Sequence, residues 1–344
     1  MAEEEAITQK VEEPDKPGFF TRLRRRDERV RVAAEVAGTH RPFRWRLFRR
    51  VIVIVVVAVA LYYPAGMIAV HKIDDDTGFQ PAVTAGQSRA AAVMAGLLSR
   101  EIETHGWTAN DPFFLPSSQL DNMPNYQLGI VAALARFTIE MADHIGRASA
   151  NTNPDPDLER ARELLGYAGT VWVFSFKTWS GAPPSEQQYL AARDALLAYN
   201  KRLAANKAVF DRRAPKLQAT LARIATDLGT VAGQLEARVT TASGAIIDTR
   251  SDDVFYSAKG RIYAYYLILR ALGLDYAKVL REKQLEKAWP QMLASLKRAA
   301  EIKPFIVRNG APDSFLQPNH LAAQGLYLLR ARSQLREIAG ILLK

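Results

Sequence analysis

The sequence predicts an all-α protein in which a single N-terminal transmembrane helix is followed by a helical bundle containing a long antiparallel helical hairpin. The first observation behind this fold class is an uncharged run of twenty residues, 51–70. A helix rises about 1.5 Å per residue, so this run can cross a hydrocarbon core about 30 Å thick. The second is the chain after residue 84, where alanine and leucine recur at helical spacing and long β-branched alternations are missing. The third is a heptad rhythm over residues 189–240.

The chain before the apolar run divides into two segments of opposite charge. Residues 1–20 are acidic and lack a hydrophobic pattern, which predicts a disordered tail. Residues 21–50 carry eleven arginines and are predicted to be a basic juxtamembrane cytoplasmic segment, with a short helix at the headgroup level. The arginines nearest the span are predicted to face anionic lipid, and they are Arg41, Arg44, Arg46, Arg49 and Arg50.

Charge asymmetry around residues 51–70 predicts the orientation of the span. Arginines precede it, whereas the aspartates Asp74–Asp76 follow it. Lysine and arginine are retained on the cytoplasmic side, so the N-terminus is expected in the cytoplasm and the chain after about residue 71 outside. In a Gram-negative cell this predicts a single-pass inner-membrane protein with a periplasmic C-terminal domain. A cleaved signal peptide is disfavoured, because its charged region would be about fifty residues long rather than the usual few.

Residues 71–84 are predicted to be an extended linker with solvated aspartates, and residues 85–344 to be a helical domain. Prolines and polar N-cap residues separate the helices of this domain. Pro290 lies inside one of them, so that helix is expected to bend or to begin anew there. The predicted helices span residues 85–105, 125–147, 157–177, 185–211, 215–240, 252–273, 275–300 and 318–343.

The most regular pattern lies in residues 189–240. From Leu217 to Leu235, apolar residues recur in steps of four and three, and the helix before them has the same rhythm. Two such helices joined at Asp211–Pro215 predict an antiparallel hairpin. The hairpin is expected in the bundle core, with two alternatives: an arm that projects as a coiled coil, or a contact between two copies of the chain.

A long connection between two predicted helices holds the first group of candidate binding residues. It is rich in turn formers and aromatics, a composition typical of binding loops and equally of packed Ω-loops. The candidate residues are Trp107, Asn110, Asp121, Asn122, Asn125 and Tyr126.

A second group of polar residues lies at the starts of two later helices. Asp252 and Asp253 open a helix that also carries Lys259, and Asn319 with His320 opens the last helix. The alternative interpretation is structural, because carboxylates favour a helix N-terminus and a lone histidine there is usually a cap or a surface residue. Together the five residues form a candidate polar cluster.

Known catalytic and metal-binding patterns are missing from the sequence. There is no cysteine, no HExxH, GxSxG, SxxK, P-loop or GxGxxG motif, and the five histidines are scattered. A calcium-like run beginning at Asn151 has Pro156 and Arg162 where the loop needs glycine and glutamate. We therefore predict no catalytic residue, no metal and no cofactor. The juxtamembrane arginines are explained by membrane orientation, so nucleic acid is not expected as a partner.

Two segments carry a resemblance to a known family. LDNMPNYQLG (120–129) and DDVFYSAKGRIYAYYLILRAL (252–272), together with the arrangement of residues 50–344, resemble the bacterial domain-of-unknown-function family 2333. The resemblance implies a single-pass membrane protein with a helical envelope domain. It implies no reaction and assigns no catalytic role to any position.

The leading functional hypothesis is non-enzymatic: a membrane anchor presents a helical domain that binds another cell-envelope component, as a scaffold or accessory subunit. The first alternative is an envelope enzyme of unfamiliar type, in which Asp121, Asp252 and Asp253 act with Lys259 or His320 as general acids and bases. The second alternative is a tethered carrier that holds a lipid or another hydrophobic ligand in an apolar cavity.

Overall fold

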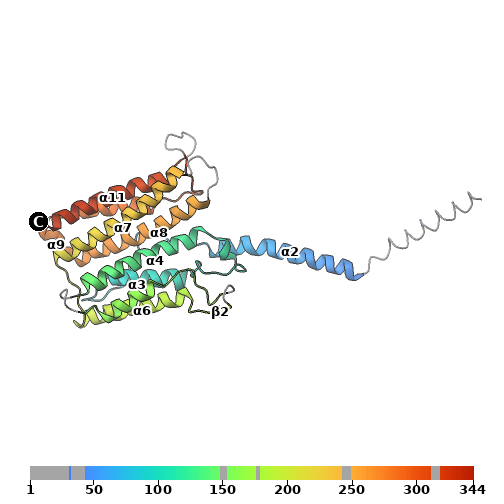
Figure 1. Ribbon diagram of the computed structural model, residues 1–344, viewed down its shortest axis with the longest axis horizontal. Coiled ribbons are helices and arrows are strands. Elements are labelled where there is room, and N and C mark those ends of the chain that lie inside the picture. The colour runs from blue at the N-terminus through green and yellow to red at the C-terminus, as the bar shows by residue number, and fades with distance from the viewer. Residues whose placement is uncertain (1–30, 32–42, 148–152, 176–178, 242–248, 311–317) are drawn as a thin grey trace, which may run out of the picture. The chain divides into compact units, whose positions relative to one another are not determined.

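A computed structural model describes residue 31 and residues 43–147, 153–175, 179–241, 249–310 and 318–344 (Figure 1). The predicted acidic tail, most of the basic segment and Arg41 lie outside the described residues. Two compact units make up the chain, Met1–Tyr62 and Tyr63–Lys344. The described residues are predominantly helical, which confirms the all-α fold class.

Helix α2 (Phe43–Val70) contains the apolar run. Its segment Leu47–Val70 is, within the described part of the chain, the one helix long and apolar enough to cross a membrane, with a mean hydropathy of 2.5. None of that apolar window is buried inside the protein, whereas a core helix of a soluble domain is mostly buried. The helix begins at Phe43, so residues 43–50 extend it without a break instead of forming a separate interfacial helix.

The second unit is a bundle of helices that are long and run nearly parallel or antiparallel (Figure 1). Short π-helical turns extend two of them, over Arg100–Thr104 and Met141–Ile145, and a 3-10 turn covers Pro116–Gln119. The helices are α3 (Arg89–Ser99), α4 (Asn122–Glu140), α5 (Pro156–Leu165), α6 (Ser185–Ala204), α7 (Ala214–Thr241), α8 (Thr249–Asp275), α9 (Ala277–Glu282), α10 (Ala288–Ala300) and α11 (His320–Leu342).

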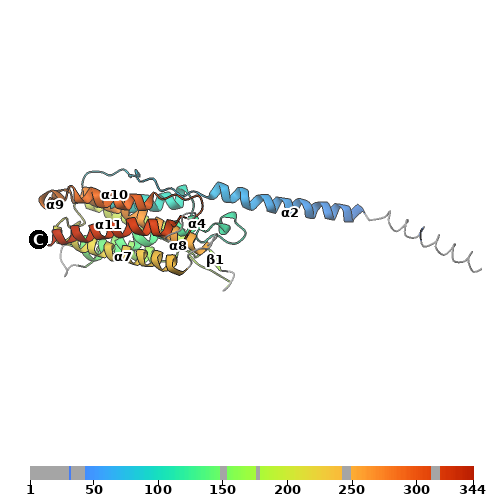
Figure 2. The same cartoon turned by 90° about the horizontal axis from the view of Figure 1, so that it is seen from above.

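Helix α8 is the centre of the bundle. It packs against α4, α3, α10 and α7, while α7 also packs against α11 and α6 against α3 and α5. Figure 2 shows α10 beside α11 at the edge of the bundle. Apolar side chains at helical spacing fill the core, among them Phe137, Leu196, Leu228 and Leu335.

Two glycines let α4 and α8 touch backbone to backbone. A Cβ on Gly129 would lie 2.2 Å from the Ser257 carbonyl oxygen, and one on Gly260 would lie 2.0 Å from the Tyr126 carbonyl oxygen. These distances are far below van der Waals contact, so neither helix tolerates a side chain there. Gly129 and Gly260 both fall inside the two segments that carry the family resemblance.

The predicted helix 157–177 is wrong beyond Leu165. The chain turns at Gly166 and forms an antiparallel hairpin from β1 (Phe174–Ser175) and β2 (Ser180–Gly181). The Ser185 hydroxyl donates to the Ala168 carbonyl over 2.7 Å and accepts from the Val171 N–H over 2.9 Å, which fixes the turn. The prediction for Pro290 is confirmed, because a new helix, α10, begins at Ala288.

The predicted pairing within residues 189–240 does not join α6 to α7: α7 packs mainly against α11 and also against α8. Helix α6 ends at Ala204, and Asn206 has a left-handed φ of 55°, which stops the helix before the predicted residue 211. Helix α6 then packs against α3 and α5. The heptad side chains of both helices, such as Leu196 and Leu228, are buried, so residues 189–240 lie in the bundle.

Residues 72–79, here called the strap, run as irregular chain across the bundle surface. Buried tyrosines hold the backbone of the strap: the Tyr126 hydroxyl donates to the Asp74 carbonyl over 2.8 Å and the Tyr263 hydroxyl to the Asp76 carbonyl over 2.7 Å. The guanidinium of Arg270 donates to two further carbonyl oxygens of the strap. The strap is therefore docked on the bundle.

Within the strap, the prediction of solvated aspartates is wrong for Asp75 and right for the exposed Asp76. Asp75 is 6% exposed, and its carboxylate lies 2.8 Å from Lys259 Nζ and 2.6 Å from Lys303 Nζ. Lys259 is itself buried and also donates to the Ile302 carbonyl over 2.7 Å. Removing the Asp75 carboxylate from water costs free energy. Its pairing with two lysine ammonium groups offsets that cost.

Candidate functional site

Three of the six residues predicted for the first binding loop are buried and engaged within the protein. Trp107 Nε1 donates to the Gly169 carbonyl over 2.9 Å. Asn110 Nδ2 donates to the Val171 carbonyl and to Glu186. Tyr126 is buried and binds the strap. These three side chains pack the loop against the protein. This agrees with the alternative interpretation of the connection as a packed Ω-loop.

The other three residues stand at the start of α4. Asp121 is the N-cap, and its Oδ1 accepts from the Asn122 N–H over 2.8 Å. The Oδ1 atom of Asn122 is buried without a hydrogen-bond partner among the described residues. Asn125 is one turn further on, and its Nδ2 donates to the Asp121 carbonyl over 2.9 Å and to Asp253 Oδ1 over 2.7 Å. Asn125 therefore joins the first predicted stretch to the second.

The predicted polar cluster of five residues does not assemble around one point. Asp252 and Asp253 lie half-buried in the first turns of α8. Lys259 points elsewhere, because its ammonium pairs with Asp75. Burial lowers the pKa of Lys259, and the hydrogen bond with Asp75 opposes that change.

Asn319 and His320 begin α11 and are engaged by the segment before it. The Asn319 side chain caps the helix by accepting from the Ala322 N–H over 2.8 Å. His320 Nδ1 accepts from the Arg308 N–H over 3.0 Å, and burial followed by the charge of Arg308 lowers the pKa of this histidine. Asn319 Nδ2 also donates to Asn309, whose own Nδ2 donates to the Arg238 carbonyl over 3.0 Å.

An open groove lies where α4 and α8 begin and α7 ends, and we call it the α4–α7–α8 groove. Its volume is about 530 Å³, which is within the usual range of ligand sites. The groove joins the two predicted stretches, because Asn125 and Asp253 both face it. Its lining consists of Asn125, Gln234, Ala237, Arg238, Thr241, Asp253, Val254 and Ser257.

The groove offers both signs of charge and several neutral hydrogen-bonding groups. Arg238 supplies a guanidinium, held where its Nε donates to Ser251 Oγ over 3.2 Å. Asp253 supplies a carboxylate on the α8 side, and Gln234 and Thr241 add exposed amide and hydroxyl groups. This chemistry suits a polar partner with donors and acceptors, such as a protein segment, better than an apolar ligand.

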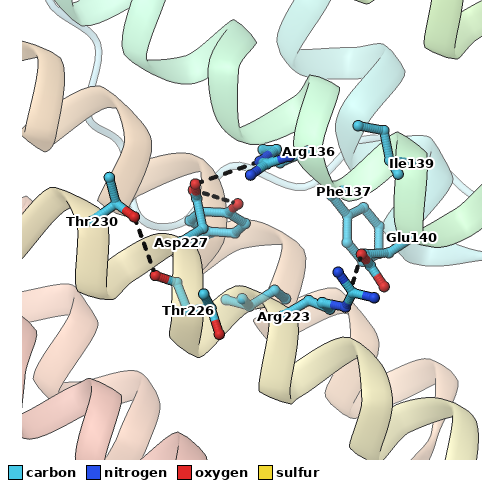
Figure 3. A pocket seen from close by; sticks show the side chains of 10 residues that line it. Arg136, Phe137, Ile139, Glu140, Arg223, Thr226, Asp227 and Thr230 are labelled. Carbon is cyan, nitrogen blue, oxygen red and sulfur yellow. Dashed lines mark hydrogen bonds and ion pairs between the residues drawn. The ribbon is translucent and has the colours of Figure 1, made fainter.

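A second, smaller cleft of about 120 Å³ lies on another part of α4, α7 and α8 (Figure 3). Asp227 sits in its wall, where Tyr265 donates to Asp227 Oδ2 over 2.8 Å and Arg136 lies 3.7 Å from Oδ1. Figure 3 also shows Glu140 facing Arg223, at 3.9 Å. Burial raises the pKa of Glu140, and the charge of Arg223 opposes it.

Sequence reasoning missed most of the side chains that line these two cavities. Gln234, Arg238 and Thr241 follow one another at helical spacing on α7, but a solvated helix face has the same appearance. Asp227 adjoins the apolar stripe of α7, and its partners come from α4 and α8. The spacing of residues along one helix does not show which side chains of other helices they meet.

The predicted lipid-facing arginines are only partly described. Arg49 and Arg50 are exposed on α2. Arg44 and Arg46 belong to the same helix, and their side chains lie outside the described residues, as does Arg41.

Comparison with known protein families gives a match over most of the chain. The model of a family described as an uncharacterized protein conserved in bacteria (DUF2333) matches residues 43–250 and 246–344. A search of curated proteins found no match, and neither did a search of solved structures. The two matched ranges together cover α2 and all the helices of the bundle, so the chain belongs to the DUF2333 family.

Proposed function

We propose that the chain is a single-pass inner-membrane protein whose bundle lies in the periplasm and binds another cell-envelope component in the α4–α7–α8 groove. It would serve as a scaffold or accessory subunit. The observation that supports this role is the groove itself, in which Asn125 and Asp253 meet beside Arg238. Its mixture of charges and amides favours a segment of an envelope protein as the partner.

The orientation rests on charge. Arg49 and Arg50 precede the apolar part of α2, while Asp74–Asp76 follow it. Since the chain contains no cysteine, a single Lys278→Cys substitution gives a unique label. The Lys278 side chain is 85% exposed. A membrane-impermeant maleimide should label it in spheroplasts without lysis, and labelling only after lysis would reverse the orientation.

Photocrosslinking tests the groove. A photoreactive amino acid at Gln234, which is exposed in the groove, is expected to give a discrete adduct in intact cells. Gln291 on α10 is the matched control, because it is also an exposed glutamine on a helix and lies outside the groove. The Gln234 adduct should weaken when Arg238 is replaced by glutamine. No adduct at Gln234, or equal adducts at both glutamines, would contradict the proposal.

The two alternatives receive less support from the geometry. The enzyme alternative requires three aspartates to act with Lys259 or His320, and these are Asp121, Asp252 and Asp253. Lys259 instead pairs with Asp75, and His320 accepts a hydrogen bond from the Arg308 backbone N–H. A hydrophobic carrier needs an apolar cavity, whereas charged or amide side chains line the groove and the smaller cleft. A further cleft, lined by apolar residues such as Pro81, Ala92 and Leu197, has about 310 Å³, at the lower end of the range of ligand sites.

A further inference from the structure

We infer that an aromatic ridge at one end of the bundle inserts into the outer interface of the lipid bilayer, beside the last turns of α2. The ridge consists of Phe113, Phe114, Trp172, Phe174 and Trp179. This inference rests on the membrane placement proposed above and is independent of the groove. It adds a second contact between the protein and lipid, besides the span itself.

The loop that carries Phe113 is attached to the end of α2. The Tyr63 hydroxyl donates to the Phe113 carbonyl over 3.0 Å. One turn later, Gly66 faces Pro116 so closely that a Cβ would lie 2.3 Å from the proline ring. Lys72 N also donates to Met123 Sδ, over 3.3 Å, just beyond the end of the helix. These contacts fix the height of the loop along α2.

Along α2, the attachment point of this loop lies before the C-terminal end of the apolar run. Tyr63 precedes Val70 by seven residues, which corresponds to about 10 Å along a helix. Side chains of a helix point toward its N-terminus, so the Tyr63 hydroxyl lies no higher than its own Cα atom. If residues up to Val70 reach through the bilayer, the Phe113 carbonyl lies at the depth of the headgroups or the adjoining acyl chains. Interfacial groups are typically buried about 5–10 Å into that boundary.

The loop and the adjoining β1–β2 hairpin carry exposed aromatic side chains. Phe113 is 70% exposed, Phe114 42% and Trp179 79%. Ring contacts connect the loop to the β1–β2 hairpin: Phe114 meets Trp172 at 5.7 Å, and Phe174 meets Trp179 at 6.0 Å between ring centroids. Tryptophan and other aromatic rings are enriched at membrane interfaces, where an apolar ring and a polar edge both find suitable surroundings. Exposed aromatic rings beside the end of a membrane span therefore fit lipid as their partner.

Lipid-quenching of single labels tests the inference. Phe113→Cys and Trp179→Cys are made separately in the full cysteine-free chain, labelled with an environment-sensitive fluorophore, and placed in nanodiscs with brominated or spin-labelled phosphatidylcholine. We expect shallow quenchers to reduce fluorescence at both positions at least twofold. Leu274→Cys is the matched control, because Leu274 is also an exposed apolar residue, 52% exposed, and lies at the opposite end of α8. It should show no quenching.

A fourth label separates this inference from the placement on which it rests. Val56→Cys lies in the middle of the apolar run and should be quenched by deep-lying bromines. Quenching at Val56 with none at Phe113 and Trp179 would overturn the inference and leave the span intact. No quenching at Val56 would overturn the membrane placement and the inference with it. Quenching at Phe113 and Trp179 but not at Leu274 supports the ridge.

Discussion

The two sides of α8 differ in how they use charged residues. On one side, Lys259 is buried and pairs with Asp75 of the strap. On the other side, Asp253 and Ser257 line an open groove. Gly260 lies on the helix face that carries Asp253 and Ser257, where it touches α4. All four residues of α8 belong to the same short segment of sequence. The comparison shows that burial, rather than the presence of a charge, separates the residues enclosed in the fold from those that reach the groove.

A large destabilisation is expected where α4 and α8 touch. Gly260→Ala places a Cβ 2.0 Å from the Tyr126 carbonyl oxygen, so α4 and α8 must separate. We expect a loss of about 3 kcal/mol in the free energy of unfolding, measured by chemical denaturation of the full chain in detergent. Gly233→Ala is the control: its Cβ meets nothing within 4 Å, so it should stabilise α7 by about 0.5–1 kcal/mol. Equal effects would disprove the close contact.

The closed side of α8, where Lys259 pairs with Asp75 of the strap, gives an effect at least as large. Asp75→Ala leaves the buried Lys259 without its carboxylate and should cost about 3–5 kcal/mol. Asp76→Ala removes the exposed neighbour, whose Oδ1 accepts from the Gly78 N–H over 2.7 Å, and should cost about 1 kcal/mol. If the two variants unfold at the same denaturant concentration, the strap is not docked as described.

The pH dependence of the strap follows from Asp75. Burial raises the pKa of this carboxyl, but hydrogen bonds and charges of Lys259 and Lys303 outweigh burial and place it below the ordinary 3.8. A depressed folded pKa stabilises the protein above the unfolded pKa, and this stability is lost as the pH falls through the folded pKa. The difference in unfolding free energy between the native chain and Asp75→Asn should therefore be constant above about pH 5. It should shrink below pH 3.8. A difference independent of pH would contradict the pairing.

The open side should give the smallest effect on stability and the largest effect on binding. Arg238→Gln removes a charge from the groove and one hydrogen bond to Ser251, which should cost less than about 1 kcal/mol. Loss of a charged hydrogen bond to the partner, about 1.4 kcal/mol, should lower the Gln234 adduct roughly tenfold. An unchanged adduct would place the partner elsewhere.

Much of the fold was predictable because its signals are local. The apolar run, the Ala- and Leu-rich helices and the restart near Pro290 depend on neighbours in sequence. The pairing of α7 was not predictable in this way. A heptad stripe shows that α7 buries one face, but α8 and α11 cover that face, rather than α6. The turn after Leu165 depends on Ser185, which lies seventeen residues beyond its carbonyl partner Ala168.

The candidate site was partly predictable. Asn125 and Asp253 were singled out, and they meet although 128 residues separate them. Gln234 and Arg238 were missed because they resemble any solvated helix face. Lys259 was grouped with Asp252 and Asp253, but its ammonium pairs with Asp75 instead. The burial of Asp75 could not be anticipated, since its two lysine partners lie far along the chain.

The most direct test measures stability and crosslinking in the same two variants, Asp75→Ala and Arg238→Gln, each carrying the photoreactive group at Gln234. Asp75→Ala should lower the unfolding free energy strongly but leave the adduct in the fraction that remains folded. Arg238→Gln should keep the native stability to within about 1 kcal/mol and lose most of the adduct. If both variants change the two quantities together, the two sides of α8 do not have separate roles and the account is wrong.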